Sequence, residues 1–264
     1  MALVRCDFFS DVLGLSTSMT VILPQSTTGQ IGMAGSESTG PAPVLYLLHG
    51  LSDDDTIWLR RTSIERYVAS LGLAVVMPQV HRSFYTDEVH GNRYWTFLSE
   101  ELPALVESFF RLSRRREDTF VAGLSMGGYG ALKWALSRPE RFAAAASLSG
   151  AVDVAGMQAQ GEWRPDLMDQ VFGADPIAGG RNDLFHLVDE VDPAAAPPLW
   201  LSCGTEDVLI DSHRRLVEKV KSKGLTLEER SGPGEHEWGL WDRQIQDVLA
   251  WLPLRAGRAG EVRR

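Results

Sequence analysis

The chain has few cysteines and no long hydrophobic run. Its only two cysteines, Cys6 and Cys203, lie far apart in the 264 residues. That spacing fits neither a metal site nor a redox pair, so we expect each to be a small buried residue on a strand. No segment reaches membrane-spanning length, and the first residues lack the apolar run of a signal peptide. We therefore expect a cytoplasmic protein without a membrane partner, although removal of an export signal would leave the same sequence.

Clusters of basic residues are also missing. The chain has 26 Lys and Arg against 35 Asp and Glu, and its net charge is -9. This balance disfavours nucleic acids, anionic membranes and acidic polymers as partners, and it favours solubility. Because 44% of the residues are hydrophobic, the chain can bury a large core. We expect a single domain over residues 1–255 and a frayed polar tail over residues 256–264.

Apolar strands alternate with amphipathic helices along the chain. Residues 44–48 are apolar throughout, as is typical of strands inside parallel sheets. The alternation predicts a doubly wound, mostly parallel sheet of about eight strands, with residues 3–9 and 15–23 paired antiparallel at its edge. Residues 152–195 break the pattern and are expected to form a small inserted cap of short helices. The helices with the clearest spacing are expected over residues 56–71, 96–112, 208–223 and 238–252.

Ser125 lies in a glycine-rich turn between a buried strand and a helix. Gly123 and Gly127 flank it in the pattern Gly-x-Ser-x-Gly, which is typical of a nucleophile elbow, a sharp turn without room for Cβ atoms. The unpaired N–H groups and the dipole at the start of the helix stabilise negative charge. The alternative is a turn that serves only tight helix packing. The strand, motif and helix together favour a catalytic serine.

A serine hydroxyl becomes a good nucleophile only when a neutral imidazole takes its proton and a carboxylate orients that imidazole. After a nucleophile elbow, the carboxylate and then the histidine follow in chain order, each on a loop at the carboxyl end of a strand. Asp207 directly follows the predicted strand 199–203, and His236 lies in a glycine-rich loop after the last strand. The sequence therefore predicts these two partners, with Glu206 and Asp211 as alternatives for the carboxylate.

The other histidines fit the role of base less well. His213 lies inside a predicted helix and His186 inside the cap, whereas His81 and His90 precede the elbow. His49 directly follows a strand, in a position that more often braces the next loop through its own hydrogen bonds. We therefore expect a structural role for it.

The tetrahedral intermediate that follows attack by such a serine carries an oxyanion, which needs two N–H donors. Met126, directly after the serine, is expected to supply one, and Leu51, in the loop after an earlier strand, the other. This chemistry needs no metal or cofactor. The run from Asp53 to Asp55 could suggest a metal, but three adjacent carboxylates cannot all face one ion. We expect a solvated turn in which Asp55 caps the next helix.

Several segments together carry a resemblance to a known enzyme family. They are Leu47-Leu48-His49-Gly50, Ser83-Phe84-Tyr85, residues 117–128 and Gly204-Thr205-Glu206-Asp207. In these segments the chain resembles the bacterial tributyrin esterase and acetylesterase group. That group belongs to the putative-esterase branch of the α/β-hydrolases, together with S-formylglutathione hydrolases, feruloyl esterases and mycolyltransferases. The resemblance runs from the first strand to the last helix and implies an α/β-hydrolase fold.

The resemblance implies a serine carboxylesterase that acts on a small-molecule ester, with acyl groups from acetyl to butyryl, and that uses no cofactor. S-formylglutathione hydrolases usually carry Gly-His-Ser-Met-Gly-Gly at the elbow, whereas this chain has Leu124 before Ser125. Such a hydrolase, a feruloyl esterase and an acyltransferase with the same triad remain alternatives, as does a non-catalytic scaffold. The sequence leaves the acyl length, the alcohol and association into a homo-oligomer open.

Overall fold

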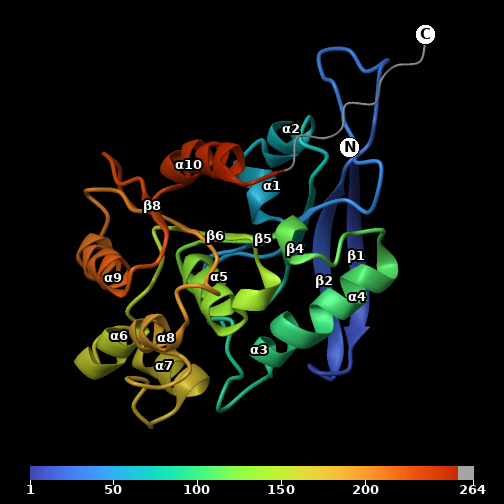
Figure 1. Cartoon of the computed structure of the whole chain (residues 1–264). Coiled ribbons are helices and arrows are strands. Elements are labelled where there is room, and N and C mark those ends of the chain that lie inside the picture. Colours follow the sequence, from blue (N-terminus) through green and yellow to red (C-terminus); the bar gives the residue numbers. More distant parts are fainter. Residues whose placement is uncertain (255–264) are drawn as a thin grey trace.

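Strands that are buried along their whole length form the centre of one eight-stranded sheet (Figure 1). The computed structural model describes residues 1–254, and the strand order is β1-β2-β4-β3-β5-β6-β7-β8. β1 pairs antiparallel with β2, as the sequence predicts. β4 also pairs antiparallel with β2, and the other neighbours are parallel, which gives the expected, mostly parallel sheet. The strands are β1 (Ala2–Ser10), β2 (Leu15–Leu23), β3 (Val44–Leu48), β4 (Ala74–Pro78), β5 (Thr119–Leu124), β6 (Ala144–Leu148), β7 (Leu199–Ser202) and β8 (Leu227–Glu229).

Successive residues of the central strands pack on opposite faces of the sheet. In β3, Tyr46 joins one hydrophobic core and Leu45 the other, because side chains alternate along a strand. Helices α1, α2 and α10 cover one face, and α4, α5 and α9 cover the other (Figure 1). The helices are α1 (Ile57–Arg61), α2 (Ile64–Val68), α3 (Tyr94–Thr96), α4 (Leu102–Phe109), α5 (Met126–Ser137), α6 (Val154–Gln160), α7 (Pro165–Phe172), α8 (Leu184–Glu190), α9 (Ile210–Lys223) and α10 (Trp238–Trp251).

The prediction of a single helix over residues 56–71 is wrong, because the structure has two helices there, α1 and α2. Thr62 ends α1 with an extended backbone, and its Oγ1 donates to the Trp58 carbonyl at 2.6 Å. The Ile64 N–H then donates to Thr62 Oγ1 at 3.1 Å. The threonine side chain thus competes with the helical hydrogen bonds, which the spacing of apolar residues does not reveal.

The helix predicted over residues 96–112 begins earlier, ends already at Phe109, and contains a π-helical turn, η1 (Phe97–Glu101), between α3 and α4. Glu101 ends this turn, and its carboxylate accepts a hydrogen bond from the Asp11 N–H at 2.8 Å and another from the Ser10 hydroxyl. The wider turn therefore directs Glu101 toward the connection between β1 and β2.

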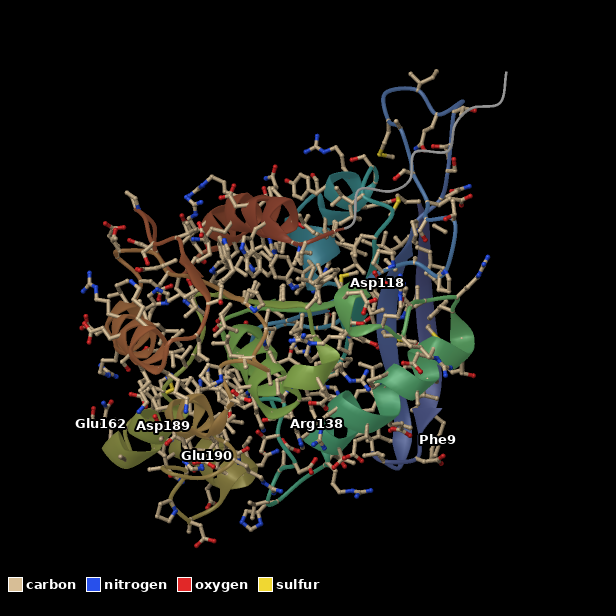
Figure 2. All side chains as sticks on the ribbon, in the orientation of Figure 1. Phe9, Asp118, Arg138, Glu162, Asp189 and Glu190 are labelled. Atoms are coloured by element: carbon tan, nitrogen blue, oxygen red, sulfur yellow. The ribbon has the colours of Figure 1, made fainter. Side chains whose placement is uncertain are left out.

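The segment predicted as a cap contains α6, α7 and α8, which lie together in Figure 1. Lys219 of α9 donates to Asp189, in α8, at 2.6 Å; Asp189 is labelled in Figure 2. The Val89 N–H donates to the Val171 carbonyl of α7 at 3.0 Å. The segment is therefore joined both to α9 and to the loop after β4.

The predicted tail over residues 256–264 lies outside the described residues, and the division into one domain with a cap remains a prediction. Among the helices of residues 1–254, none combines the length and the apolar character needed to span a bilayer.

Candidate active site

Ser125 lies between β5 and α5 in a strained backbone conformation. Its φ is 52° and its ψ is -118°, and such a conformation costs a non-glycine residue about 1–3 kcal/mol. The Ser125 N–H donates to the Leu148 carbonyl at 2.9 Å, and the Ala151 N–H donates to the Ser125 carbonyl at 3.0 Å. The neighbouring strand end and the loop after it therefore hold the serine at the carboxyl end of β5.

Gly123 and Gly127 allow the main chain to pass close to itself at this turn. A Cβ on Gly123 would lie 2.3 Å from the Gly127 carbonyl oxygen, and one on Gly127 would lie 2.4 Å from the Leu48 carbonyl oxygen. Both distances are far below van der Waals contact. This is the crowding that the Gly-x-Ser-x-Gly pattern predicts, and it places the first turn of α5 against the end of β3.

The structure brings Ser125, His236 and Asp207 together through two hydrogen bonds. His236 Nε2 is 3.0 Å from Ser125 Oγ, and His236 Nδ1 is 2.8 Å from Asp207 Oδ2. An ionised carboxylate can only accept, so Nδ1 carries the proton and Nε2 accepts from the serine hydroxyl. In this arrangement the imidazole can take the hydroxyl proton while the carboxylate stabilises the imidazolium that forms.

The carboxylate of Asp207 is buried but well supplied with hydrogen-bond donors. Burial opposes its ionisation, but hydrogen bonds from His236 and the Leu209 N–H outweigh this and lower the pKa of Asp207. The Leu209 N–H lies 2.9 Å from Oδ1. Burial, together with the charge of Asp207, raises the pKa of the neighbouring Cys203 to about 12, so this thiol is protonated at neutral pH.

The two alternative acids have other partners. Glu206 accepts from the Gly234 N–H at 2.6 Å and so holds the loop that carries the histidine. Asp211 is exposed and pairs with Arg214 at 3.1 Å. The histidine of α9, His213, contacts a serine hydroxyl at 3.2 Å. Of the candidates, the structure thus places Asp207 and His236 beside the elbow.

His49 is buried beneath the loop after β3 and holds it through both ring nitrogens. Nδ1 donates to the Gly50 carbonyl at 2.7 Å, and Nε2 accepts from the Val80 N–H at 3.2 Å. Burial is the main cause that lowers the pKa of His49 to about 4. The ring is therefore neutral at pH 7, and its bonds confirm the predicted structural role.

Neutral burial of His49 should make the protein less stable in acid. As pH falls below about 6.5, the unfolded chain binds a proton at this residue, but the folded chain does not until about pH 4. Between pH 7 and pH 4 the wild type should lose about 3 kcal/mol more unfolding free energy than His49→Gln. Urea denaturation at four pH values measures this. Equal slopes of unfolding free energy against pH for wild type and His49→Gln would contradict the prediction.

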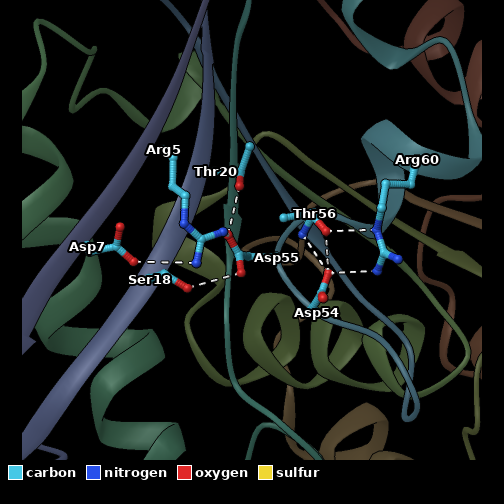
Figure 3. Close-up of polar contacts among 8 residues, drawn as sticks. All are labelled: Arg5, Asp7, Ser18, Thr20, Asp54, Asp55, Thr56 and Arg60. Carbon is cyan, nitrogen blue, oxygen red and sulfur yellow. Dashed lines mark hydrogen bonds and ion pairs between the residues drawn. The ribbon is translucent and has the colours of Figure 1, made fainter.

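The aspartates of the same loop point to different partners (Figure 3). Asp55 is buried and accepts from Ser18 at 3.0 Å and from Thr20 at 2.7 Å, both on β2. Asp54 pairs instead with Arg60 at 3.1 Å. The prediction that Asp55 lies in a solvated turn and caps α1 is wrong, because its carboxylate ties that turn to the sheet. Within the part of the chain that the structure describes, no group of three or more His, Cys, Asp or Glu side chains could hold a metal ion.

The assignment of two backbone N–H groups, those of Met126 and Leu51, as oxyanion donors remains a prediction. Met126 is the first residue of α5, and the first N–H groups of a helix have no acceptor inside it. Leu51 is half-buried in the loop that His49 braces. Both belong to segments that converge at the elbow, because the first turn of α5 lies against the end of β3.

Sequence reasoning missed several side chains around these residues. Ser149 follows β6 with a φ of 45° and is fully buried near Asp207. Lys133 is buried in α5, where a single lysine among apolar residues was the available signal. Tyr85 was noted only as part of a motif, yet it contacts the loop of His49.

The strand order, with a serine at a strained turn between β5 and α5, defines an α/β-hydrolase. The chain belongs to the family described as "Putative esterase", which matches residues 10–252. An acetyl esterase of Caldicellulosiruptor saccharolyticus is 28% identical, over 96% of this chain and 98% of that protein. The chain is a carboxylic ester hydrolase.

Solved structures of similar proteins agree with this assignment. The fluorophosphonate-binding serine hydrolase F of Staphylococcus aureus superposes with a TM-score of 0.85 at 32% identity, covering 95% of this chain and 98% of that one. An S-formylglutathione hydrolase of the same organism gives a TM-score of 0.81 at 32% identity, with the same coverage.

Proposed function

We propose that the protein is a serine carboxylesterase that hydrolyses short-chain acyl esters, from acetyl to butyryl. The hydrogen-bonded series from Ser125 through His236 to Asp207 carries this proposal, with distances of 3.0 and 2.8 Å. In it Ser125 is the nucleophile, His236 the general base and then acid, and Asp207 the residue that orients His236.

In the acylation step, Ser125 Oγ attacks the ester carbonyl carbon and His236 Nε2 takes the hydroxyl proton. The carbonyl oxygen becomes an oxyanion, which accepts hydrogen bonds from the N–H groups of Met126 and Leu51. Each such donor is worth about 10²–10³ in rate. Collapse of the intermediate breaks the bond to the alcohol oxygen, and His236 protonates the leaving alcohol.

In the deacylation step, His236 takes a proton from a water molecule, and the oxygen of that water attacks the carbonyl carbon of the acyl group on Ser125. The second oxyanion occupies the same site, and its collapse releases the carboxylic acid. His236 returns the proton to Ser125 Oγ, which restores the enzyme. Asp207 stabilises the imidazolium in both steps, and its lowered pKa keeps it ionised for that purpose.

The preference for short acyl groups is supported by the acetyl esterase that matches nearly the whole chain. We further propose that the cap, residues 152–195, and the loop over residues 81–95 shape the pocket for the substrate. Phe84 of that loop packs against Trp163 and Phe172 of the cap, with ring centroids 6.0 and 5.7 Å apart. A substrate pocket built there depends on contacts between the two segments.

A substrate series tests the proposed specificity. The p-nitrophenyl acetate and butyrate esters should have the highest kcat/KM, and the octanoate should have a kcat/KM at least about tenfold lower. The reason is that a methylene group that does not fit the pocket can raise the activation free energy by about 1–3 kcal/mol. A methyl feruloyl ester and S-formylglutathione complete the series. A higher kcat/KM for octanoate would contradict the short-chain proposal but leave the mechanism intact.

An S-formylglutathione hydrolase is the second candidate, because a solved structure of that description shares 32% identity and a TM-score of 0.81. Its acyl group, formyl, is also short, and the same three residues would act. A kcat/KM for S-formylglutathione above that for acetyl esters would favour it. Product analysis with added alcohols separates hydrolysis from acyl transfer, which differs only in the group that deacylates Ser125.

A further inference from the structure

The loop after β4 has an unusual backbone conformation. His81, Phe84 and Tyr85 have φ values of 51°, 49° and 51°. This left-handed region costs a non-glycine residue about 1–2 kcal/mol. Phe84 and Tyr85 are also fully buried. Strain of this kind persists only where surrounding contacts over-determine the backbone, so the contacts of Tyr85 identify what holds the loop.

Tyr85 contacts His49, which lies two residues before Leu51, the residue whose N–H we propose as an oxyanion donor. Its hydroxyl donates to the His49 carbonyl at 2.9 Å. The same carbonyl lies close to the elbow, because a Cβ on Gly127 would be 2.7 Å from its oxygen. The His49 carbonyl is thus located between the Tyr85 hydroxyl and the first turn of α5, two residues before Leu51.

Helix α5 also contacts Tyr85 directly, through both its ring and its main chain. A Cβ on Gly130 would lie 2.4 Å from the tyrosine ring, so glycine leaves the space that the ring fills. Lys133 Nζ donates to the Tyr85 carbonyl at 3.1 Å and to Thr86 Oγ1 at 2.7 Å. The helix that begins directly after Ser125 therefore holds the loop at this residue.

The burial of Lys133 needs an explanation beyond space-filling. The side chain is 2% exposed, its two acceptors are neutral oxygens, and its Nζ lies 4.7 Å from the centre of the Trp95 ring. Burial lowers the pKa of Lys133 well below its usual value. The charge of Asp87 favours the protonated amine, but both hydrogen-bond acceptors of Lys133 are neutral. Its burial is therefore costly, and an apolar side chain would fill the same space more favourably. Its hydrogen bonds to the loop are the property that such a side chain lacks.

We propose that Tyr85 and Lys133 are positioning residues that together hold the oxyanion loop, residues 49–51, in place relative to Ser125. Lys133 fixes the tyrosine to α5, and the tyrosine hydroxyl fixes the carbonyl of His49. The inference rests on the proposed function, because it concerns the Leu51 N–H as an oxyanion donor. A displacement of about 1 Å at a reacting site can lower the rate about 100-fold.

Tyr85→Phe removes only the hydroxyl and is the first test. We expect kcat for p-nitrophenyl acetate to fall about 10-fold to 100-fold, with KM changed less than about threefold, because the lost alignment matters mainly in the transition state. The inhibition constant of phenylboronic acid should rise by the same factor as kcat/KM falls, since its serine adduct places an oxygen in the oxyanion site. Tyr67→Phe is the control: its hydroxyl donates to Asp242 at the same 2.9 Å, between α2 and α10, and kcat should stay within about twofold.

Lys133→Met is the second test, because methionine is an unbranched side chain only one atom shorter than lysine and has no hydrogen-bond donor. It should give the same pattern of lower kcat, unchanged KM and weaker boronate binding. If both residues act through one loop, kcat of the double variant should be little lower than kcat of the more impaired single variant, because the effects of coupled residues do not add. Losses that multiply in the double variant would overturn the proposed link between the two residues.

Three results overturn the proposal: a kcat within twofold of wild type in both variants, a loss confined to KM, or a loss that only follows the folded fraction in thermal unfolding. Ser125→Ala, measured in the same assay, separates this failure from failure of the proposed function. If Ser125→Ala retains the wild-type rate, the proposed function is wrong. If Ser125→Ala is inactive while Tyr85→Phe and Lys133→Met are fully active, only the positioning role is wrong.

Discussion

Replacing Ser125 by alanine is expected to lower kcat for p-nitrophenyl acetate by about 10⁵-fold to 10⁶-fold. The variant lacks the oxygen that we propose attacks the ester and accepts the acyl group. His236 would then have no hydroxyl at 3.0 Å from which to take a proton. The remaining rate would come from substrate binding and the oxyanion donors alone. Steady-state kinetics measures the loss, and labelling by a fluorophosphonate probe should disappear in parallel.

Alanine has the same backbone restrictions as serine at a φ of 52°, so the fold should survive the change. Equal thermal unfolding of variant and wild type would verify this. Ser222→Ala, on the exposed side of α9, is the matched control and should keep full activity, since its hydroxyl only donates to the Lys219 carbonyl at 2.8 Å. Activity of Ser125→Ala above about one tenth of wild type would exclude Ser125 as the nucleophile.

Replacing Asp207 by asparagine is expected to lower kcat by about 10⁴-fold, although the side chain keeps its shape. The carboxylate accepts from His236 Nδ1 at 2.8 Å and so keeps the proton on that nitrogen. An amide can donate to Nδ1 instead, and the imidazole proton then lies on Nε2. A protonated Nε2 cannot accept a hydrogen bond from Ser125. The variant would also lose the negative charge that stabilises the imidazolium. The loss should appear in kcat, with KM little changed.

The neighbouring acids supply the controls for this variant. Asp211→Asn changes an exposed carboxylate that pairs with Arg214, and it should leave kcat unchanged. Glu206→Gln should cost less than about tenfold, because a glutamine oxygen can still accept from the Gly234 N–H. If Glu206→Gln lost as much as we expect for Asp207→Asn, and Asp207→Asn were nearly active, Glu206 would be the orienting acid.

Much of the candidate site could be predicted because it depends on local chain properties. The turn at Ser125 requires small neighbours, and Gly123 and Gly127 show that requirement directly in the sequence. Likewise, residues 44–48 are apolar throughout because β3 is buried on both faces. Such features involve residues a few positions apart, so composition and spacing reveal them.

The role of Asp55 shows why other features were mispredicted. Its partners, Ser18 and Thr20, are 37 and 35 residues away along the chain. An aspartate before a predicted helix is most simply a cap, and nothing in the local sequence indicates that β2 places two hydroxyl groups beside it. The contact depends on the place of β2 in the sheet, between β1 and β4.

The network of Tyr85 and Lys133 has the same origin. Lys133 donates to Thr86 across 47 residues of sequence, and Tyr85 donates to His49 across 36. The sequence shows a tyrosine in a loop and a lysine in an apolar helix, but neither pattern says that the two side chains meet. Packing of α5 against the loop after β4 decides that contact.

The sequence by itself determined the kind and order of most elements, the strained turn at Ser125 and the loops on which Asp207 and His236 lie. These follow from local propensity, from side-chain periodicity and from the need for glycine where the backbone is crowded. Only the tertiary structure decided that the serine and histidine, 111 residues apart in sequence, meet at 3.0 Å, and that Asp207 rather than Glu206 faces the imidazole. Distances of that kind depend on how the strands assemble into a sheet, and no local pattern records that assembly.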